Sequence, residues 1–480
     1  MPSPRPAYQT DDVTLYQGDA LALLRQLPSG SVHCCVTSPP YFGLRDYGMA
    51  EQIGLEWTPD AYVARLVEVF REVRRVLHDT GTLWLNLGDS YATGGGKVGE
   101  SPGGGPQGER WTGYRGTRPG SAKHAAGAMG PMTQPNRMPL PGLKPKDLIG
   151  IPWRVAFALQ ADGWYLRSDV IWHKPNPMPE SVQGWRWERH RVQVVHGAVS
   201  RQADLGGNGR ERHGHTIADK PQPAEWIDCP GCRTCAPHDG YVLRRGSGRL
   251  TKAHEYVFLL TKTDTYFYDS EAVLEPCASG PSDIKKMLEQ RDRITSRYRD
   301  AHDPWLAGGN GRIGRKRAVG SPAGRNRRSV WTLATQPYKG SHFATFPPKL
   351  VEPMLLAGTS AHGCCAKCLA PWVRVVHRQT APHPANGRHS GRGAGHFRPQ
   401  ESGRQHRPGH EICVVTNSET LGWRPTCPHD APLMPCTVLD PFAGAATTGL
   451  VALQHGRRFV GLELNPSYLA QAITRLTDAA

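Results

Sequence analysis

The chain has 480 residues, and its 58 lysine and arginine residues exceed its 42 aspartate and glutamate residues by enough to give a formal net charge of +16. This excess favours a polyanionic partner, and we expect that partner to be nucleic acid. No apolar run approaches the roughly 20 residues that cross a bilayer, and residues 1–30 lack the pattern of a signal peptide. We therefore expect a cytoplasmic protein with reduced cysteines, and neither a membrane protein nor a secreted one.

Strand and helix patterns alternate along the chain. In order, we expect a strand over 32–38, a helix over 59–81, a strand over 82–90, a helix over 147–164, strands over 165–175, 254–262 and 437–442, a helix over 447–457 and a strand over 458–464. This alternation predicts an α/β fold, with a parallel sheet covered by helices on both faces.

Long stretches between these elements are rich in glycine, proline and basic residues and poor in apolar ones. They span residues 94–145, 176–253, 276–335 and 378–412. Such composition cannot bury enough apolar area to order itself, so surface loops are one interpretation. A surface that orders on a phosphate backbone is the other.

The strand over 32–38 runs directly into Ser38-Pro39-Pro40-Tyr41. Two prolines fix two backbone angles and withhold two N–H donors, and the residue before each proline is held extended. The sequence therefore predicts a stiff loop that presents hydrogen-bond acceptors. Cys34 and Cys35 precede this loop, and we interpret them as core residues rather than as nucleophiles.

A second informative turn follows the strand that ends at Asp440. Gly444 allows a ligand to approach the backbone closely where the strand turns into a helix. The free N–H groups at the start of that helix favour a carboxylate. Glu463 ends the next strand, which is where a ribose diol would be held. The turn and the acid together predict a nucleotide-like cofactor site.

Two motifs, TSPPY (37–41) and DPFAGAATTG (440–449), resemble the catalytic and S-adenosylmethionine motifs of DNA amino-methyltransferases. The catalytic motif comes first, which resembles the circularly permuted beta arrangement. The resemblance implies a Rossmann-like S-adenosylmethionine-dependent methyltransferase sheet with loop-rich basic insertions and zinc-ribbon-like insertions. Residues 16–28 resemble a further cofactor motif, with Asp19 facing the adenine ring, and residues 343–360 resemble the motif around the methionine end.

The resemblance also assigns roles to single residues. It implies catalytic roles for Ser38, Pro39, Pro40 and Tyr41, and cofactor binding by Asp19, Thr37, Asp440, Pro441, Phe442, Ala443, Gly444, Thr447, Thr448 and Glu463. The Ser38 hydroxyl and the Pro39 carbonyl would accept from the amino group, and Tyr41 would stack on the flipped base. This chemistry requires the loop at 38–41 to lie beside the turn at 440–444.

One departure concerns the cofactor turn. The family's usual Gly-Ser-Gly-Thr-Thr reads here as Gly444-Ala445-Ala446-Thr447-Thr448. Alanine adopts a positive φ only at a cost, so we expect the turn to form but the cofactor affinity to be less certain.

The target base is predicted from the first position of the catalytic motif. A serine there resembles enzymes that methylate cytosine N4, whereas aspartate is more typical of those that methylate adenine N6. We therefore favour cytosine N4 and keep adenine N6 as the alternative. Other classes stay open: an RNA or protein methyltransferase, and a DNA-binding module with an inactive cofactor site.

Two cysteine clusters have the spacing of structural zinc sites. The first combines Cys365, Cys368, Cys427 and His429, and the second combines Cys229, Cys232, Cys235 and His238. Reduced cysteines without a ligand are the alternative interpretation.

The domain prediction has five parts. They are a catalytic half of the core (1–175), a target-recognition region (176–335) whose strand 254–262 returns to the core, the methionine-end motif (336–362), a zinc-ribbon-like insert (363–435) and an S-adenosylmethionine-binding half (436–480). The recognition candidates are Trp185, Arg186, Trp187, Arg189, His190, Arg191 and the arginine-rich run 312–328. Duplex DNA is the expected partner, any cognate restriction endonuclease would be a separate chain, and the oligomeric state is left open.

Overall fold

The computed structural model describes residues 4–44, 47–49, 51–92, 143–144, 146–177, 182–194, 225–246, 248–276, 324–336, 346–383 and 413–479. The chain divides into two compact units. Unit 1 comprises Met1–Asn176 and His254–Ala480, and unit 2 comprises Pro177–Ala253. Across the described ranges, no helix is both long and apolar enough to cross a membrane.

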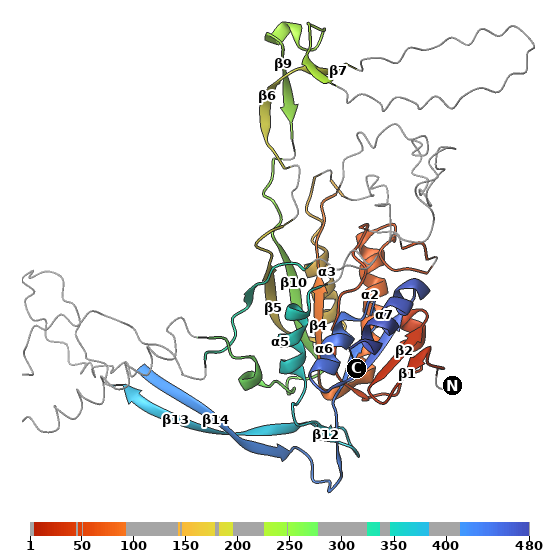
Figure 1. The fold of residues 1–480 in the computed structure, drawn as a ribbon, viewed down its shortest axis with the longest axis vertical. Coiled ribbons are helices and arrows are strands. Elements are labelled where there is room, and N and C mark those ends of the chain that lie inside the picture. Colours follow the sequence, from red (N-terminus) through yellow and green to blue (C-terminus); the bar gives the residue numbers. More distant parts are fainter. Residues whose placement is uncertain are drawn as a thin grey trace, which may run out of the picture. The chain divides into compact units, whose positions relative to one another are not determined.

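Unit 1 is built on one nine-stranded sheet (Figure 1). Its strand order is β1 (Tyr8–Gln9), β2 (Val13–Gln17), β17 (Arg458–Glu463), β16 (Thr437–Asp440), β3 (Val32–Thr37), β4 (Leu77–Leu87), β10 (His254–Thr261), β5 (Tyr165–His173) and β11 (Val330–Thr332). Strands from the two ends of the chain are therefore neighbours at the centre, which confirms the permuted α/β fold.

The sheet is mixed: the predicted parallel arrangement holds for its central strands but does not extend to every strand. Strands β2, β17, β16, β3 and β4 run parallel. Strand β10 runs antiparallel to both β4 and β5. An apolar run such as residues 254–262 suits a buried strand in either direction, so the sequence pattern carried no information on its direction.

Helices cover both faces of the sheet, as expected. One core holds the buried residues of α1 (Ala20–Leu24), α2 (Pro59–Val76) and α3 (Ile151–Ala161). The other holds those of α5 (Pro348–Gly358), α6 (Thr447–Gln454) and α7 (Pro466–Thr477). Successive side chains of β3 point to opposite faces of the sheet, so Cys35 belongs to the first core and Cys34 to the second. Both cysteines are fully buried, as expected of core residues.

Helix α2 is shorter than its apolar spacing predicts. It begins as expected, with Thr58 capping the N–H of Ala61 at 3.1 Å. It ends at Val76, five positions before the expected stop at Gly81, and β4 starts at once with Leu77. Leu77 is buried and pairs with Val32 in the sheet, so sheet pairing overrides the helical periodicity at this point.

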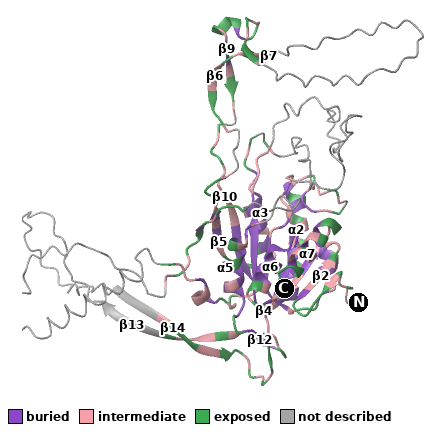
Figure 2. Ribbon diagram, viewed as in Figure 1, coloured by how far each residue is buried: buried purple, intermediate pink, exposed green. Residues whose placement is uncertain are grey.

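Smaller elements lie outside the sheet. In unit 1, β12 (Cys364–Cys365) pairs with β15 (Leu433–Met434), and β13 (Trp372–His383) pairs with β14 (Cys413–Pro425). Unit 2 contains β6 (Trp185–Arg189), β7 (Arg191–Val194), β8 (Glu225–Asp228), the short helix η1 (Ala236–His238) and β9 (Tyr241–Arg245). Figure 2 shows buried residues concentrated in the sheet and helices of unit 1 and few in these smaller elements.

Candidate functional site

The two motifs meet at the carboxyl ends of neighbouring strands. Strand β3 carries the Pro-Pro loop, β16 carries the cofactor turn, and the two strands pair in parallel. The hydroxyl Oγ1 of Thr37 donates to Oδ1 of Asp440 at 2.7 Å, across 403 positions of sequence. Tyr41 and Phe442 both pack against the same hydrophobic core. The loop at 38–41 thus lies beside the turn at 440–444, as its proposed chemistry requires.

The Asp440 carboxylate organises this junction. It is 1% exposed, and it accepts from the Thr37 hydroxyl, from the Thr448 hydroxyl at 2.8 Å and from the Phe442 N–H at 3.1 Å. Burial raises its pKa to about 6, although the two threonine hydrogen bonds oppose the shift. One carboxylate therefore fixes the ends of both motif strands and the first turn of α6.

The turn between β16 and α6 has two left-handed residues, Gly444 (φ 52°) and Ala446 (φ 54°). The Ala446 N–H donates to the Ala443 carbonyl at 2.7 Å, so the turn forms with alanine at the position that the family gives to glycine. Alanine pays roughly 1–2 kcal/mol for this conformation. Burial of its methyl group in the core offsets part of that cost.

Glu463 closes the same turn from the end of β17. Its Oε2 accepts the Gly444 N–H at 2.8 Å, and its Oε1 accepts the Asn465 N–H at 2.7 Å. Burial raises its pKa to about 7, against the pull of these backbone N–H groups. The carboxylate is thus poised between its charged and neutral forms near neutral pH.

Asp19 follows the end of β2, at the same edge of the sheet as the carboxyl ends of β16 and β17. The Gly18 N–H donates to the Glu463 carbonyl at 2.9 Å, which places Asp19 beside the tip of β17. Its own Oδ1 accepts the Ala22 N–H at 2.9 Å and caps α1. Three neighbouring strands, β2, β17 and β16, therefore each end in a carboxylate at one edge of the sheet.

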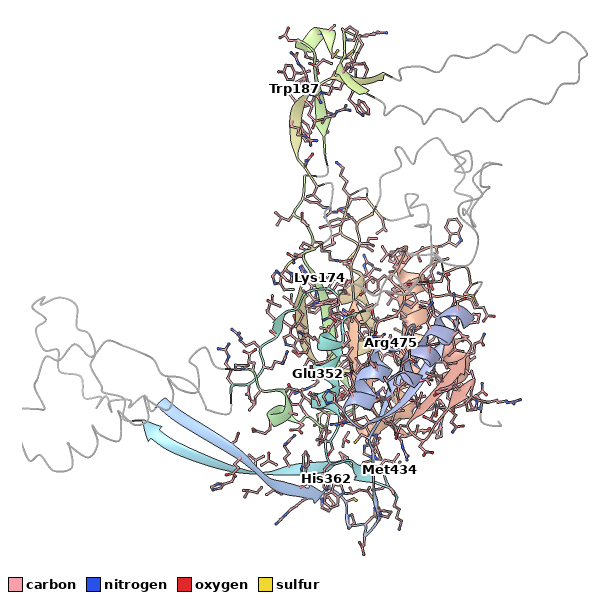
Figure 3. All side chains as sticks on the ribbon, in the orientation of Figure 1. Lys174, Trp187, Glu352, His362, Met434 and Arg475 are labelled. Carbon is pink, nitrogen blue, oxygen red and sulfur yellow. The ribbon has the colours of Figure 1, made fainter. Side chains whose placement is uncertain are left out.

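The remaining predicted cofactor residues lie on the same turn. Pro441 continues from Asp440, and the Ala443 N–H donates to the Leu462 carbonyl at 2.9 Å. The Thr447 hydroxyl accepts from Nη1 of Arg475 at 2.8 Å, which ties the first residue of α6 to α7. Arg475 is labelled on α7 in Figure 3.

The Pro-Pro loop is held by its prolines and by hydrogen bonds. The Tyr62 hydroxyl donates to the Pro40 carbonyl at 2.8 Å. Within the described ranges, no hydrogen bond is made to the Pro39 carbonyl, which leaves that acceptor for a ligand. The Ser38 hydroxyl lies 3.4 Å from the Tyr41 hydroxyl, which is long for a hydrogen bond between hydroxyls. The Ser38 oxygen can therefore still accept a hydrogen bond from a ligand. Ser38 and Pro39 together can therefore offer acceptors to an amino group.

The Tyr41 hydroxyl is anchored by residues that the sequence analysis did not single out. It donates to Oε2 of Glu255 at 2.7 Å and lies 3.2 Å from Oδ1 of Asn86. The other oxygen of Glu255 pairs with the ammonium of Lys174, which is labelled in Figure 3. The same ammonium lies over the Trp172 ring, 4.3 Å from its centroid. Burial and the Glu255 charge hold the pKa of Tyr41 well above its usual value.

Strand direction explains why these residues were missed. Because β10 runs antiparallel, its first residues and not its last reach the edge where β3, β4 and β5 end. Glu255 stands second in β10, and no local pattern marks it as a site residue. Had residues 254–261 been predicted as an antiparallel strand, Glu255 would have been expected at the same edge as the Pro-Pro loop.

Comparisons with known proteins identify the family. Type II methyltransferase M.Cfr9I of Citrobacter freundii is 33% identical over 468 residues, which cover 98% of this chain and 89% of that protein. Type II methyltransferase M.XycI of Xanthomonas campestris pv. cyanopsidis is 34% identical over 463 residues, covering 96% and 87%. A profile of the DNA methylase family matches residues 32–365 and 436–474. The chain belongs to the DNA methylase family.

Among solved structures, the chain aligns with the PvuII DNA methyltransferase (cytosine-N4-specific). The alignment covers 99% of this chain and 94% of the other, with 15% identity and a TM-score of 0.42. The DNA methylase profile includes the Pro-Pro loop at 38–41 and the turn at 440–444, and it skips residues 366–435, which contain β13 and β14. The relatives and the profile confirm the expected family. The β13–β14 insert lies outside the part of the chain that the family profile matches.

Beside the methylase core, the first cysteine cluster comes together as its spacing predicts. The ligand atoms of Cys365, Cys368, Cys427 and His429 all lie within 4.8 Å of one another. Cys365 and Cys368 flank the turn after β12, and the other two residues follow β14. The set has the number and type of ligands of a tetrahedral zinc site.

The second cluster has a different histidine from the one expected. Cys229, Cys232 and Cys235 converge with His190, again within 4.8 Å. His238 instead packs its ring on Trp187, with the centroids 4.8 Å apart. His238 sits in the short helix η1 directly after the last cysteine, and that helix carries it to the Trp187 side. The prediction of His238 as the fourth ligand is therefore corrected to His190.

A third group, His33, Cys364 and Cys436, is buried but is not suited to a metal. The Thr437 N–H donates to Nδ1 of His33 at 2.9 Å, and Nε2 lies 2.9 Å from the Leu369 carbonyl. Both ring nitrogens are thus occupied, and burial lowers the His33 pKa to about 4. A neutral imidazole with both nitrogens hydrogen-bonded has no lone pair for an ion.

Of the predicted recognition residues, those at 185–191 lie in β6, in β7 and at His190 between them. Residues 312–323 of the arginine-rich run lie outside the described residues. The same holds for 343–345 at the start of the expected methionine-end motif, whose remainder forms α5 and the chain around it.

Proposed function

We propose that this DNA methylase transfers a methyl group from S-adenosylmethionine to the exocyclic N4 of cytosine in duplex DNA. The supporting observation is the Thr37–Asp440 hydrogen bond, which joins the acceptor-bearing loop to the cofactor turn. Ser38 at the first motif position supports cytosine N4 over adenine N6. Adenine N6 is the alternative outcome of the same test.

The donor set at the strand ends suits S-adenosylmethionine. This cofactor carries a cationic sulfonium, an ammonium group and a ribose diol, and it supplies an electrophilic methyl group when bound. Asp19, Asp440 and Glu463 place three carboxylates at neighbouring strand ends, which favours a cation there. Glu463 would hold the diol, and Asp19 would face the adenine.

The Pro-Pro loop would act on the target amino group. Its lone pair is delocalised into the base, so the nitrogen must pyramidalise to attack. The Ser38 hydroxyl and the Pro39 carbonyl would accept its N–H hydrogens and stabilise the positive charge that develops. Because the prolines fix the loop, these acceptors need no rearrangement. The flipped base would stack on Tyr41, whose hydroxyl Glu255 holds.

The decisive experiment combines methyl transfer with product analysis. Purified protein would be incubated with labelled S-adenosylmethionine and duplex DNA, and the digested DNA examined by mass spectrometry. We expect N4-methylcytosine and at least a hundredfold (roughly 3 kcal/mol) loss in Ser38→Ala. Recovery of N6-methyladenine alone would overturn the base assignment. Methylation of tRNA or a peptide in preference to DNA, or no binding of the cofactor, would overturn the proposal itself.

We further propose a structural zinc ion at each cysteine cluster, with the first held by Cys365, Cys368, Cys427 and His429. Such an ion would fix the base of the β13–β14 insert, because two ligands precede β13 and two follow β14. Metal analysis of the purified chain tests this: we expect two zinc ions per chain, and fewer than two would contradict the proposal. The type II relatives also support a cognate restriction endonuclease on a separate chain.

A further inference from the structure

The second cysteine cluster closes the end of a two-stranded ribbon in unit 2. Sγ of Cys232 lies 3.4 Å from Nδ1 of His190 and 3.6 Å from Sγ of Cys235. Ligands of a tetrahedral zinc ion, at about 2.3 Å for sulfur and 2.0 Å for nitrogen, are separated by roughly 3.5–3.8 Å. Sulfurs in a disulfide would be about 2 Å apart. The observed spacing is that of a metal site.

The backbone brings the four ligands together from two strand ends. His190 follows β6 directly, and the Cys229 N–H donates to its carbonyl at 2.8 Å. The Cys235 N–H donates to the Cys232 carbonyl at 3.1 Å, which closes the tight turn that CxxC needs. The His190 N–H donates to the Gly240 carbonyl at 2.8 Å, just before β9. An ion here would therefore join the ends of β6 and β9.

Unit 2 has little else to hold it together. Among its residues whose side chains the structure describes, only Cys235 and Val242 are buried. Two small side chains cannot offset the conformational entropy of ordering a segment of this size. In such domains the binding energy of a structural metal supplies the folding energy.

One face of the ribbon is aromatic and cationic. Strands β6 and β9 pair antiparallel, so Trp185 faces Arg245 and Arg189 faces Tyr241 across the ladder. The Arg245 guanidinium lies 4.6 Å from the Trp185 ring centroid, and that of Arg189 lies 5.0 Å from Tyr241. Trp185 is 67% exposed and Trp187 is 52% exposed. Trp187 is labelled in Figure 3. Exposed tryptophans clustered in this way mark a binding surface.

On the opposite face of the ribbon, two arginines share one carboxylate. There Glu188 pairs with both Arg186 and Arg244. On the tryptophan face, Arg189 is paired with Asp228, with 3.5 Å between Nε and Oδ2. Arg245, which contacts the Trp185 ring, is therefore the arginine of this face that can offer its charge to a partner. Across unit 2, twelve arginine and lysine residues stand against eight acidic ones. A two-stranded ribbon fits the major groove of DNA, where arginine reads guanine and phosphates attract the charge.

We propose that unit 2 is a β-ribbon closed by zinc at His190, Cys229, Cys232 and Cys235, and that its Trp185–Arg245 face docks on duplex DNA. This rests on the proposed function, because it takes the methylation substrate as the partner. The positive charge of this face suits the DNA backbone, and the described residues of unit 2 bury only two side chains. Together these observations point to a ribbon that folds only with its metal and then presents this face to DNA.

The metal half of the proposal is tested by zinc content of full-length variants. His190→Ala and Cys229→Ser should each bind one zinc fewer per chain than the wild type. His238→Ala is the matched control and should bind as much as the wild type. Undiminished zinc in His190→Ala, or loss of zinc in His238→Ala, would overturn the ligand set.

The docking half is tested by the affinity for a labelled random-sequence DNA duplex. Trp185→Ala and Arg245→Ala should each weaken binding by roughly 5–50-fold. Arg244→Ala, on the opposite face of the same strand, should change it by less than about twofold. An unchanged duplex affinity, or a loss confined to single-stranded DNA, would overturn the docking face. Failure of the wild type to bind S-adenosylmethionine would instead contradict the proposed function, so the two failures are distinguishable.

Discussion

At the residue scale, carboxylates at the reactive edge of the sheet do different work because their partners differ. Asp440 is buried among two hydroxyls and one backbone N–H, so it holds the two motif strands together. Glu463 accepts two backbone N–H groups. Glu255 faces a phenol and an ammonium and holds Tyr41 at the end of the Pro-Pro loop. The hydrogen-bond partners around each carboxylate determine its structural role, whether the residue is aspartate or glutamate.

Glu255 should act on catalysis through Tyr41. Glu255→Gln loses the Lys174 ion pair and weakens the hold on the Tyr41 hydroxyl, so the methyl-transfer rate should fall roughly 10–100-fold with cofactor affinity unchanged. Tyr41→Phe should show a similar loss, and the double variant should be no slower than Tyr41→Phe alone. Single-turnover kinetics would measure this, and strictly multiplicative losses would refute the coupling.

A matched control for this pair is Asp79→Asn, which removes the ion pair between Lys262 and an aspartate side chain that is 83% exposed, at the end of β4 opposite the site. Surface pairs of this kind contribute about 0–1 kcal/mol, so neither the rate nor the stability should change measurably. A rate loss in this control as large as that of Glu255→Gln would indicate a general effect on folding.

Glu463 should make stability depend on pH. Its folded-state pKa of about 7 lies above the ordinary value of 4.5. A raised carboxyl pKa contributes stability that is fully present below the unfolded pKa and is lost as pH rises through the folded pKa. The loss amounts to roughly 3 kcal/mol once complete. Between about pH 5 and pH 8, the wild type should therefore lose stability relative to Glu463→Gln.

Thermal unfolding of both proteins without cofactor across that range would measure the difference. Glutamine keeps one acceptor, for the Gly444 N–H, and loses the one that Asn465 uses. That loss shifts the stability of the variant by the same amount at every pH, so the comparison rests on the pH dependence and not on the absolute stability. Parallel pH curves for the two proteins would show that Glu463 does not titrate in this window.

At the element scale, helix α6 is pressed against strand β17 through a glycine. A Cβ added at Gly449 would lie 2.5 Å from Cδ1 of Phe459, a distance that side chains do not tolerate. Gly449 has an ordinary helical conformation, so the constraint is steric and not one of backbone strain. The close approach of this helix sets the height of the cofactor turn above the sheet.

Gly449→Ala should therefore destabilise the protein by roughly 1–3 kcal/mol despite the better helix propensity of alanine. Chemical denaturation would measure the change. Phe459→Leu removes the obstructing ring, and adding Gly449→Ala in that background should cost less than about 0.5 kcal/mol. An equal cost in both backgrounds would place the obstruction elsewhere.

Comparing the helices and strands with their predictions shows which features of the fold and site the sequence could predict. Both motif loops and their meeting were predictable, because proline and glycine act locally and parallel strands align their carboxyl ends. The direction of β10 was not, because a buried apolar strand has no directional signature. Glu255 was missed for that reason. His190 was missed because β6 and β9 bring together residues some forty positions apart, whereas His238 lies close to the cysteines only in sequence.

At the scale of the whole molecule, unit 2 is inserted between two adjacent antiparallel strands of the core. His173 at the end of β5 pairs with His254 at the start of β10, and the next residues, Lys174 and Glu255, form the ion pair beside Tyr41. The chain thus leaves the core and returns to it at the reactive edge. The core's own sheet and both of its hydrophobic clusters are complete without the insertion.

Recognition and catalysis should therefore be separable. Replacing residues 175–252 by Asn-Gly leaves a hairpin loop of about four residues between His173 and His254, a length that antiparallel strands accept readily. We expect this variant to unfold cooperatively and to bind S-adenosylmethionine as the wild type does, because every carboxylate of the cofactor edge is retained. Its KM for duplex DNA should rise more than about tenfold, because the ribbon contacts are gone. Glu255→Gln should do the reverse and lower kcat with little change in KM. An unchanged KM in the shortened protein would show that the DNA contacts lie in unit 1, and loss of cofactor binding would show that the core depends on unit 2 for its fold.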